Sequence, residues 1–436
     1  GGLDVAMTKS NDQTVLAGII ALVKSAQLSK PKIGRLVDQV TSVFVPIVVL
    51  IAVITFIVWS FFSLPHAVTA AIAVLVIACP CALGLGTPIA IMVATGRAAE
   101  EGMLIRNGAA LQLASELTYV VFDKTGTITT GVPSVVDCHY WTDRVADLHA
   151  DIHAIEMRSE HPLAQAMTDW TVKDQQKHPV QHFKSVSARG VMAEVAARSV
   201  VIGNEQWMQD NAIALEPSVL EVVQQYGQQA ATPVLVAVDG KLVAVFAVAD
   251  PIKPEAGQTI VRLHQLGLQT AMMSGDHPIT ANAVAKQVGI QTVMAQLTPK
   301  DKADYVQQLQ VKGEVVGMVG DGINDAPALT QAHVGFAIGS GTDVAIESAD
   351  VTLSRHSLDR VESAIRLSRA TLTTIKRTLF GAFVYNALGV LLAAGVFYPI
   401  WHVLLSPMIA SAAMAASSVT VVLVASRLRY RGITKA

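Results

Sequence analysis

The sequence predicts an α/β protein that also spans a membrane, with a doubly wound parallel sheet and an inserted α+β domain between two pairs of apolar helices. Of the 436 residues, 52% are hydrophobic and 15% are charged, and the mean hydropathy is +0.45. Four apolar segments approach or exceed the ~20 residues that cross a bilayer, and three short apolar strands each lead to an aspartate. The net charge of -2 without a basic run excludes nucleic acid as a partner, and 3 cysteines exclude a disulfide framework.

The four apolar segments form two hairpins, at residues 43–62 and 67–93 and at residues 379–397 and 401–425. Lysine and arginine border the outer flanks of each hairpin, and none occurs in the short connections at 63–66 and 398–399. The positive-inside rule therefore places both termini and the long middle insert in the cytoplasm. Buried core helices of a soluble protein are the alternative, which the four agreeing flanks oppose. We expect transmembrane pairs at 42–93 and 378–426, a linker helix within 1–41 and a cytoplasmic tail at 427–436.

Three predicted strands deliver carboxylates to one edge of the predicted sheet. The apolar runs 119–122, 269–273 and 315–319 are followed by Asp123, Asp276 and Asp321. The carboxyl ends of parallel strands meet at the edge where ligands bind, so we expect these carboxylates to converge. Oxygen ligands of this kind suit Mg²⁺, which usually binds through one or two carboxylates and a substrate phosphate.

Asp123 is the candidate nucleophile, because a carboxylate can attack phosphorus and form an aspartyl phosphate. Thr125, Gly126 and Thr127 would supply hydroxyls and backbone donors to the phosphoryl oxygens, and Lys302 would neutralise charge. A single Asp-Gly or Thr-Gly pair is usually only a turn. The strings DKTGT and GDGIND, taken together, are specific.

On these strings the chain resembles the P-type ATPases of the haloacid-dehalogenase-like superfamily. The resemblance implies a cytoplasmic phosphorylation domain at 94–134 and 248–377, in which Asp123 is phosphorylated by ATP. It further implies that Thr125 and Asp321 help Asp123 to hold Mg²⁺ and that Lys302 contacts the phosphate. The remaining implied catalytic residues are Lys124, Thr127, Ser274, Asp276, Asn324 and Asp325. Ser274 replaces the threonine of the usual TGD motif and keeps its hydroxyl.

The segment 135–247 lies between the first and second of these sheet motifs and differs from them in its sequence pattern. It narrows the resemblance to heavy-metal P-type ATPases. It contains Ser-Glu-His-Pro at 159–162 and a Gly-Asn pair at 203–204. A lone His-Pro is normally a helix start with an exposed histidine. The resemblance implies an inserted nucleotide-binding domain whose ATP pocket is lined by Glu160, His161, Gly190, Gly203 and Asn204. Ala188 stands where the family has the first glycine of a GxG turn, and its Cβ restricts the backbone at that position.

Cys79-Pro80-Cys81 lies within the second apolar segment. Proline lacks an amide hydrogen and clashes with the preceding turn, so we expect the helix to break there and turn the flanking side chains toward one site. A buried membrane cysteine is otherwise usually a small apolar filler. Thiolate and thioether ligands select soft ions such as Cu(I).

Polar and sulfur-bearing side chains also interrupt the last two apolar segments. Tyr, Asn, Met and Ser each have an ordinary reading as interhelical hydrogen-bonding or packing residues. Together with the Cys-Pro-Cys string they resemble the copper branch of the heavy-metal ATPases. Zinc pumps of the same family would carry an aspartate after a lysine in the last segment, and this sequence has none there. The implied ligands of the transported Cu(I) are Cys79, Cys81, Tyr385, Asn386, Met414 and Ser418.

The resemblance implies an integral protein of the plasma (inner) membrane that exports Cu(I) and contacts membrane lipid, ATP and a copper chaperone as a source of the ion. No Thr-Gly-Glu loop occurs in the chain, so we expect it to be the carboxyl-terminal portion of a pump whose amino-terminal half carries the actuator domain. That domain would end within residues 1–41. Alternatives are the same pump for Ag(I) or another soft metal, a membrane-tethered aspartate-dependent phosphatase, and a non-enzymatic scaffold.

Overall fold

The computed structural model describes residues 32–79, 81–159, 161–171, 179–186, 189–276, 278–321, 325–339, 349–353 and 357–430, with the backbone alone at 32–38, 81–83 and 162. It divides into two compact units. One consists of Gly1–Leu117, His333–His356 and Arg360–Ala436, and the other of Thr118–Ala332 and Ser357–Asp359. The predicted site residues Glu160 and Asn324 and the side chain of Cys81 lie outside the described residues.

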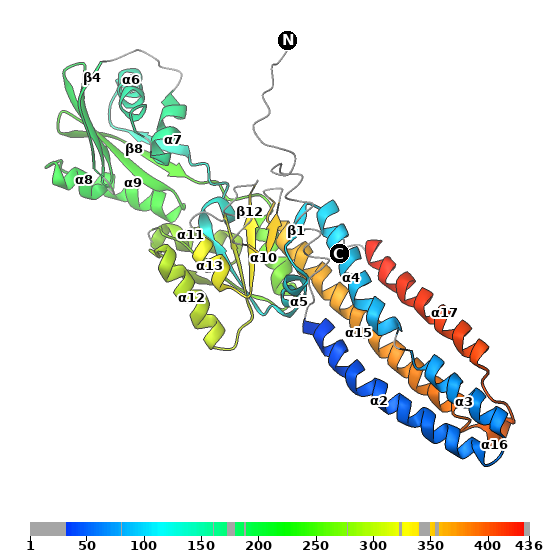
Figure 1. Cartoon of the computed structure of the whole chain (residues 1–436). Coiled ribbons are helices and arrows are strands. Elements are labelled where there is room, and N and C mark those ends of the chain that lie inside the picture. Colours follow the sequence, from blue (N-terminus) through cyan, green and yellow to red (C-terminus); the bar gives the residue numbers. More distant parts are fainter. Residues whose placement is uncertain are drawn as a thin grey trace, which may run out of the picture. The chain divides into compact units, whose positions relative to one another are not determined.

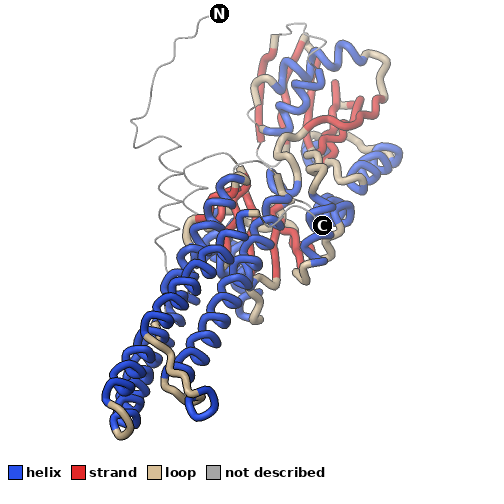
Figure 2. Tube along the Cα trace, turned by 90° about the vertical axis from the view of Figure 1, so that its right-hand side faces the viewer, coloured by secondary structure: helices blue, strands red, loops and turns tan. Residues whose placement is uncertain are grey.

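Long apolar helices dominate the first unit and lie side by side (Figures 1 and 2). They are α2 (Lys32–Ser60), α3 (Leu64–Ile77), α4 (Cys81–Glu100), α15 (Asp359–Ala393) and α17 (Pro407–Ser426), followed by the short turn η4 (Arg427–Arg429). α3 packs against α2 and α17, and α4 packs against α17. Three helical stretches are long and apolar enough to cross a membrane, at Gln39–Ser60, Asp359–Ala393 and Pro407–Arg429.

The predicted segment 67–93 consists of two helices separated by the expected break. α3 ends at Ile77 and α4 begins at Cys81, and the amide of Cys79 donates to the carbonyl of Val76 over 3.2 Å in a tight last turn. The break falls at Pro80, which has no amide hydrogen to continue the helix. The expectation of a break at Cys-Pro-Cys is thus confirmed.

The predicted span 401–425 is wrong at its start. The short helix α16 (Tyr398–Trp401) ends at His402, whose φ of 52° is left-handed. α17 then begins at Pro407, where the Ser406 side chain accepts a hydrogen bond from the amide of Ile409. A hydroxyl cap with proline at the first helical position is a strong start signal. The connection between the last two long helices is therefore longer than the predicted 398–399.

Three short strands also belong to the first unit. β1 (Met103–Ile105) pairs antiparallel with β13 (Val351–Leu353), which pairs parallel with β12 (Val334–Ile338). α5 (Gly108–Glu116) follows β1 and is capped by Asn107, whose side chain accepts from the amide of Ala110. β1 directly continues the chain from α4, and β13 precedes α15.

Four parallel strands form the sheet of the second unit that leads to the predicted catalytic residues. Their order is β11 (Val316–Gly320), β2 (Tyr119–Asp123), β9 (Gln269–Met273) and β10 (Thr292–Met294). The accompanying helices are α10 (Ala256–Gln265), α11 (Pro278–Val288), α12 (Pro299–Val311) and α13 (Ala326–Gln331). β2 and β11 are buried along their whole length, as strands covered on both faces must be.

An antiparallel sheet of six strands occupies Ser134–Ala249, in the order β3-β8-β7-β6-β5-β4. The strands are β3 (Ser134–Tyr140), β4 (Val180–Val186), β5 (Gly190–Val195), β6 (Arg198–Gly203), β7 (Thr232–Val238) and β8 (Lys241–Ala249). α6 (Val145–Glu156) and α7 (Pro162–Thr171) share one apolar core with this sheet. α8 (Glu205–Asp210) and α9 (Pro217–Gln228) share a second core with the alternate strand residues.

Candidate functional site

Asp123 stands at the end of β2, and a lysine links its carboxylate to a second one. The Nζ of Lys302 donates to Oδ1 of Asp123 over 2.6 Å and to Oδ1 of Asp325 over 2.8 Å. All three residues are buried. Lys302 reaches the site because Thr298 and Asp301 form a capping box that begins α12 one turn earlier. The geometry brings together three residues that the sequence analysis named.

Burial and mutual charge perturb all three groups. Desolvation, followed by the charge of Asp325, raises the pKa of Asp123 to about 7, although Lys302 opposes this shift. Desolvation also raises the pKa of Asp325. Desolvation would lower the pKa of Lys302, but the two carboxylates outweigh it and raise that pKa. The lysine therefore stays charged. The two carboxyl groups are harder to ionise than free ones, and because they interact closely they titrate as a pair.

The loop after Asp123 is fixed by hydrogen bonds from a segment that is distant in the sequence. Gly126 has a left-handed φ of 72°, and the Nζ of Lys253 donates to its carbonyl over 3.0 Å. The carboxylate of Asp250 accepts from Oγ1 of Thr129 over 2.5 Å and from the amide of Gly131 over 2.8 Å. The sequence analysis missed Asp250 and Lys253, whose one local signal is the DPIKP run with its two stiffening prolines.

The other predicted residues of this edge take separate partners. Lys124 forms an ion pair with Asp276, and Oγ of Ser274 accepts from the amide of Asp276 over 3.0 Å. Asp321 follows β11, and its charge contributes to the raised pKa of Asp123. Thr125 is exposed. The carboxylates at this edge are thus paired with two lysines, Lys302 with Asp123 and Asp325, and Lys124 with Asp276.

Two buried polar atoms at this edge lack a hydrogen-bond partner among the described residues. They are Oγ1 of Thr127 and Oδ2 of Asp325, and a bound water or ion is one way in which such buried atoms are satisfied. Within the described part of the chain, no three His, Cys, Asp or Glu side chains are grouped to hold a metal by themselves. The oxygen-rich edge therefore fits Mg²⁺ bound through two carboxylates and a phosphate better than a closed protein cage.

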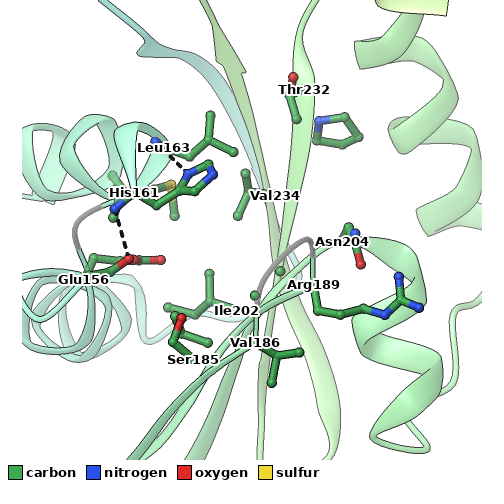
Figure 3. A pocket seen from close by; sticks show the side chains of 17 residues that line it. Glu156, His161, Leu163, Ser185, Val186, Arg189, Ile202, Asn204, Thr232 and Val234 are labelled. Carbon is green, nitrogen blue, oxygen red and sulfur yellow. Dashed lines mark hydrogen bonds between the residues drawn. The ribbon is translucent and has the colours of Figure 1, made fainter. Parts of the chain in front are cut away.

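A second candidate site is a cavity of about 320 Å³ in the six-stranded sheet domain (Figure 3). His161, Gly190, Gly203 and Asn204 line it, as the sequence analysis proposed. Nδ1 of His161 accepts from the amide of Leu163 over 3.2 Å, which leaves the proton of the neutral ring on Nε2. The volume lies in the usual range of ~300 to 1,000 Å³ for small-ligand pockets.

The two glycines permit a close approach of two backbone segments beneath this cavity. A Cβ on Gly203 would lie 2.5 Å from the carbonyl oxygen of Arg189 and 2.7 Å from the Trp207 ring, and a Cβ on Gly190 would overlap the backbone of Ile202. Asn204 uses its side-chain oxygen to cap α8, accepting from the amide of Trp207 over 2.8 Å. The side-chain oxygen of Asn204 is therefore used to cap α8 at the edge of the cavity.

Glu156 also lines the cavity and was missed by the sequence analysis. It ends α6, is 6% exposed and lies on the same side of the cavity as His161 (Figure 3). Burial raises its pKa to about 7. A neutral carboxyl in such a pocket can both donate and accept a hydrogen bond. Its spacing of five residues from His161 carried no signal, because burial is decided by the packing of α6 against the sheet.

The candidate metal residues of the apolar helices are only partly brought together. Cys79 is a free, exposed thiol at the break between α3 and α4. Met414 belongs to the same buried apolar cluster as Ala78, next to Cys79, and its carbonyl accepts from Oγ of Ser418 over 3.1 Å. Asn386 is buried in α15.

Tyr385 lines a different space, a cavity of about 500 Å³ between α15 and α17 that Ser417 also lines. The break at Cys79 and the thioether of Met414 therefore share one packed region of the helices, while Tyr385 contributes to another.

Comparison with known proteins identifies similar sequences and folds. A family described as haloacid dehalogenase-like hydrolase matches residues 117–333. The chain is 48% identical over 440 residues to the copper-exporting P-type ATPase of Vibrio cholerae serotype O1, covering 100% of this chain and 48% of that protein. It is 42% identical to the silver exporting P-type ATPase of Salmonella typhimurium, covering 98% and 53%. The chain spans about half the length of these curated relatives.

A solved zinc-transporting PIB-type ATPase in the E2.Pi state has the same fold. The TM-score is 0.78 at 29% sequence identity, over 97% of this chain and 68% of that one. The predicted fold class, an α/β phosphorylation domain with an insert and apolar helices, is confirmed by this likeness and by the family match.

Proposed function

This chain belongs to the heavy-metal P-type ATPases, and on that premise we propose that it serves ATP-driven export of Cu(I) through a phosphoaspartate. The observation that carries the proposal is the buried Asp123–Lys302–Asp325 group at the end of β2. In phosphoryl transfer most of the catalysis is positioning and electrostatic stabilisation. A carboxylate with a raised pKa beside a fixed cation suits that chemistry.

In the proposed reaction, an oxygen of Asp123 attacks the γ-phosphorus of ATP and the bond to the β-phosphate oxygen breaks. ADP leaves with that electron pair, and the enzyme keeps an aspartyl phosphate. In this proposal the ammonium of Lys302 and the hydroxyl of Thr127, which has no hydrogen-bond partner among the described residues, hold phosphoryl oxygens. Mg²⁺, when held by Asp123, Asp321 and Thr125, supplies positive charge to the transferred group.

The same proposal assigns the cavity of the six-stranded domain to ATP. Nε2 of His161 and the carboxyl of Glu156 offer hydrogen bonds to a nucleobase, and both occupy one side of the cavity (Figure 3). Gly190 and Gly203 also line the cavity, where the backbones of their two strands approach closely. Pairing of a base with buried polar groups gives selectivity, because a base without the matching groups leaves them unpaired.

The proposed cargo site is the helix break at Cys79-Pro80-Cys81 together with Met414. Thiolate and thioether sulfur favour Cu(I) over hard divalent ions, and ionisable groups in membrane helices usually mark a pathway. The same ligands suit Ag(I), and the 42% identity to a silver exporting relative makes Ag(I) the second candidate cargo.

The chain is a membrane protein by its family and its apolar helices. We place its catalytic parts on the cytoplasmic side of the plasma membrane, since the arginine and lysine flanks face that way. Copper delivery by a cytoplasmic chaperone and contact with lipid are further parts of the proposal.

The test is phosphorylation of the purified chain by [γ-³²P]ATP with Cu(I), followed by acid quenching. Asp123→Asn should abolish acid-stable label, while Asp169→Asn, which changes an exposed aspartate of α7, should not. Cys79→Ser with Cys81→Ser should remove tightly bound Cu(I), and Cys138→Ser, which changes the third cysteine, should retain it. Label on Asp123→Asn would refute the nucleophile, and unchanged copper binding would refute the cargo site.

A further inference from the structure

Arg189 stands out in the nucleotide cavity because of its charge. Among the described residues that line this cavity, it is the only arginine or lysine. The lining also includes the carboxyl of Glu156, and ATP carries several negative charges. A pocket that binds ATP needs a cation near the phosphates, because a carboxyl and neutral groups alone would not offset that charge.

The position of Arg189 suits the phosphate end of a bound nucleotide. Figure 3 shows Glu156 and His161 on one side of the cavity, and Arg189 with Asn204 on the other. Arg189 directly precedes Gly190, where β5 begins, so its backbone is fixed by the close packing of the two glycine segments. With the base at His161, the phosphates extend toward Arg189.

The guanidinium of Arg189 is paired with a carboxylate of the same chain in this structure. Its Nε donates to Oδ2 of Asp210 over 2.9 Å, and Nε2 of Gln206 donates to Oδ1 of the same aspartate over 3.3 Å. Arg189 and Asp210 are about equally exposed, at 40% and 39% of their side chains. A half-exposed pair of this kind contributes little to stability, so a phosphate can replace the aspartate at small cost.

We propose that Arg189 binds the β- or γ-phosphate of the nucleotide and that Asp210 holds it in position when the cavity is empty. This inference rests on the proposed ATP site and adds to it the residue that recognises the phosphate chain. Arginine forms paired hydrogen bonds with phosphate oxygens as it does with carboxylates. Asp210 is therefore a competitor whose removal tightens binding.

The test compares ATP, ADP and adenosine binding to the intact chain by isothermal titration. Arg189→Ala should weaken ATP and ADP roughly tenfold, the usual effect of losing one charge-assisted phosphate contact. It should leave adenosine unchanged. Asp210→Asn should tighten ATP up to about fivefold by freeing the guanidinium, and Arg189→Lys should restore part of the ATP affinity.

Lys241→Ala, which removes an exposed charge at the start of β8 away from the cavity, is the matched control and should bind all three ligands normally. Equal losses for adenosine and ATP in Arg189→Ala would show a structural role and overturn the inference. Unchanged ATP affinity in that variant would also overturn it, while leaving the proposed ATP site intact. If the unaltered chain binds neither ATP nor adenosine, the proposed function fails instead.

Discussion

Substitution of Glu156 by glutamine should remove a pH dependence of the stability of the six-stranded domain. Burial raises the pKa of Glu156 from 4.5 to about 7 in the folded chain, and the residue is only 6% exposed. The folded state therefore holds more protons than the unfolded state between these pH values. Stability falls as pH rises through that window and is constant above it.

The magnitude follows from the shift in the pKa. Relative to a carboxyl with an unshifted pKa, the raised pKa lowers the free energy of unfolding by about 3 kcal/mol at pH 8 and by about 1 kcal/mol at pH 5, from 1.36 kcal/mol for each tenfold change in proton affinity. Glu156→Gln has the same shape without the charge. It should stabilise the domain by up to about 3 kcal/mol at pH 8 and by about 1 kcal/mol or less at pH 5.

Hydrogen exchange of the intact chain measures this locally, in peptides that cover β5 and β6, after correction for the intrinsic pH dependence of exchange. The variant should exchange more slowly than the parent at pH 8 and at a similar rate at pH 5. Glu221→Gln, which changes an exposed glutamate of α9, should match the parent at both values. Equal protection of Glu156→Gln and parent at pH 8, or a larger difference at pH 5, would refute the assigned burial cost.

Three more substitutions test the remaining contacts. Lys302→Met should abolish phosphoenzyme and cost about 3 kcal/mol or more in chemical unfolding, because it leaves two buried carboxylates without a cation; persistent phosphorylation by ATP would contradict its role. Asp250→Ala should cost about 1 to 3 kcal/mol through the unpaired donors of the loop and slow single-turnover phosphorylation, whereas an unchanged rate would show that the loop keeps its shape without it. Gly203→Ala should prevent ATP binding in titrations but spare Cu(I) binding, since the added Cβ meets the carbonyl of Arg189; normal ATP affinity would show that the two backbone segments can separate.

The helices show where sequence reasoning succeeds and where it stops. The break in the second apolar segment was predictable because Pro80 acts on its own turn, through the missing amide hydrogen. The start of the last long helix was not, because His402 ends α16 in a left-handed conformation that non-glycine residues adopt only in particular surroundings. Apolar composition continues across residues 401–406 and hides the interruption.

The candidate sites divide in the same way. Asp123, the Cys-Pro-Cys string and His161 were named from short motifs, because their chemistry depends on residue type and on neighbours in the chain. Their roles in catalysis and transport stay predictions. Asp250 and Lys253 could not be named, since they meet the loop after Asp123 only through the return of the chain more than 100 residues later.

The sequence by itself determined the class of this protein: apolar helices with cationic flanks, parallel strands that end in aspartate, and soft ligands beside a proline. These are local properties that depend on composition and spacing. Only the tertiary structure decided which charges face one another, as when Lys302 reaches Asp123 across 179 positions of the chain, and how deeply Glu156 is buried. Charge pairing and desolvation depend on distance and exposure in the folded state, and a linear sequence contains neither quantity.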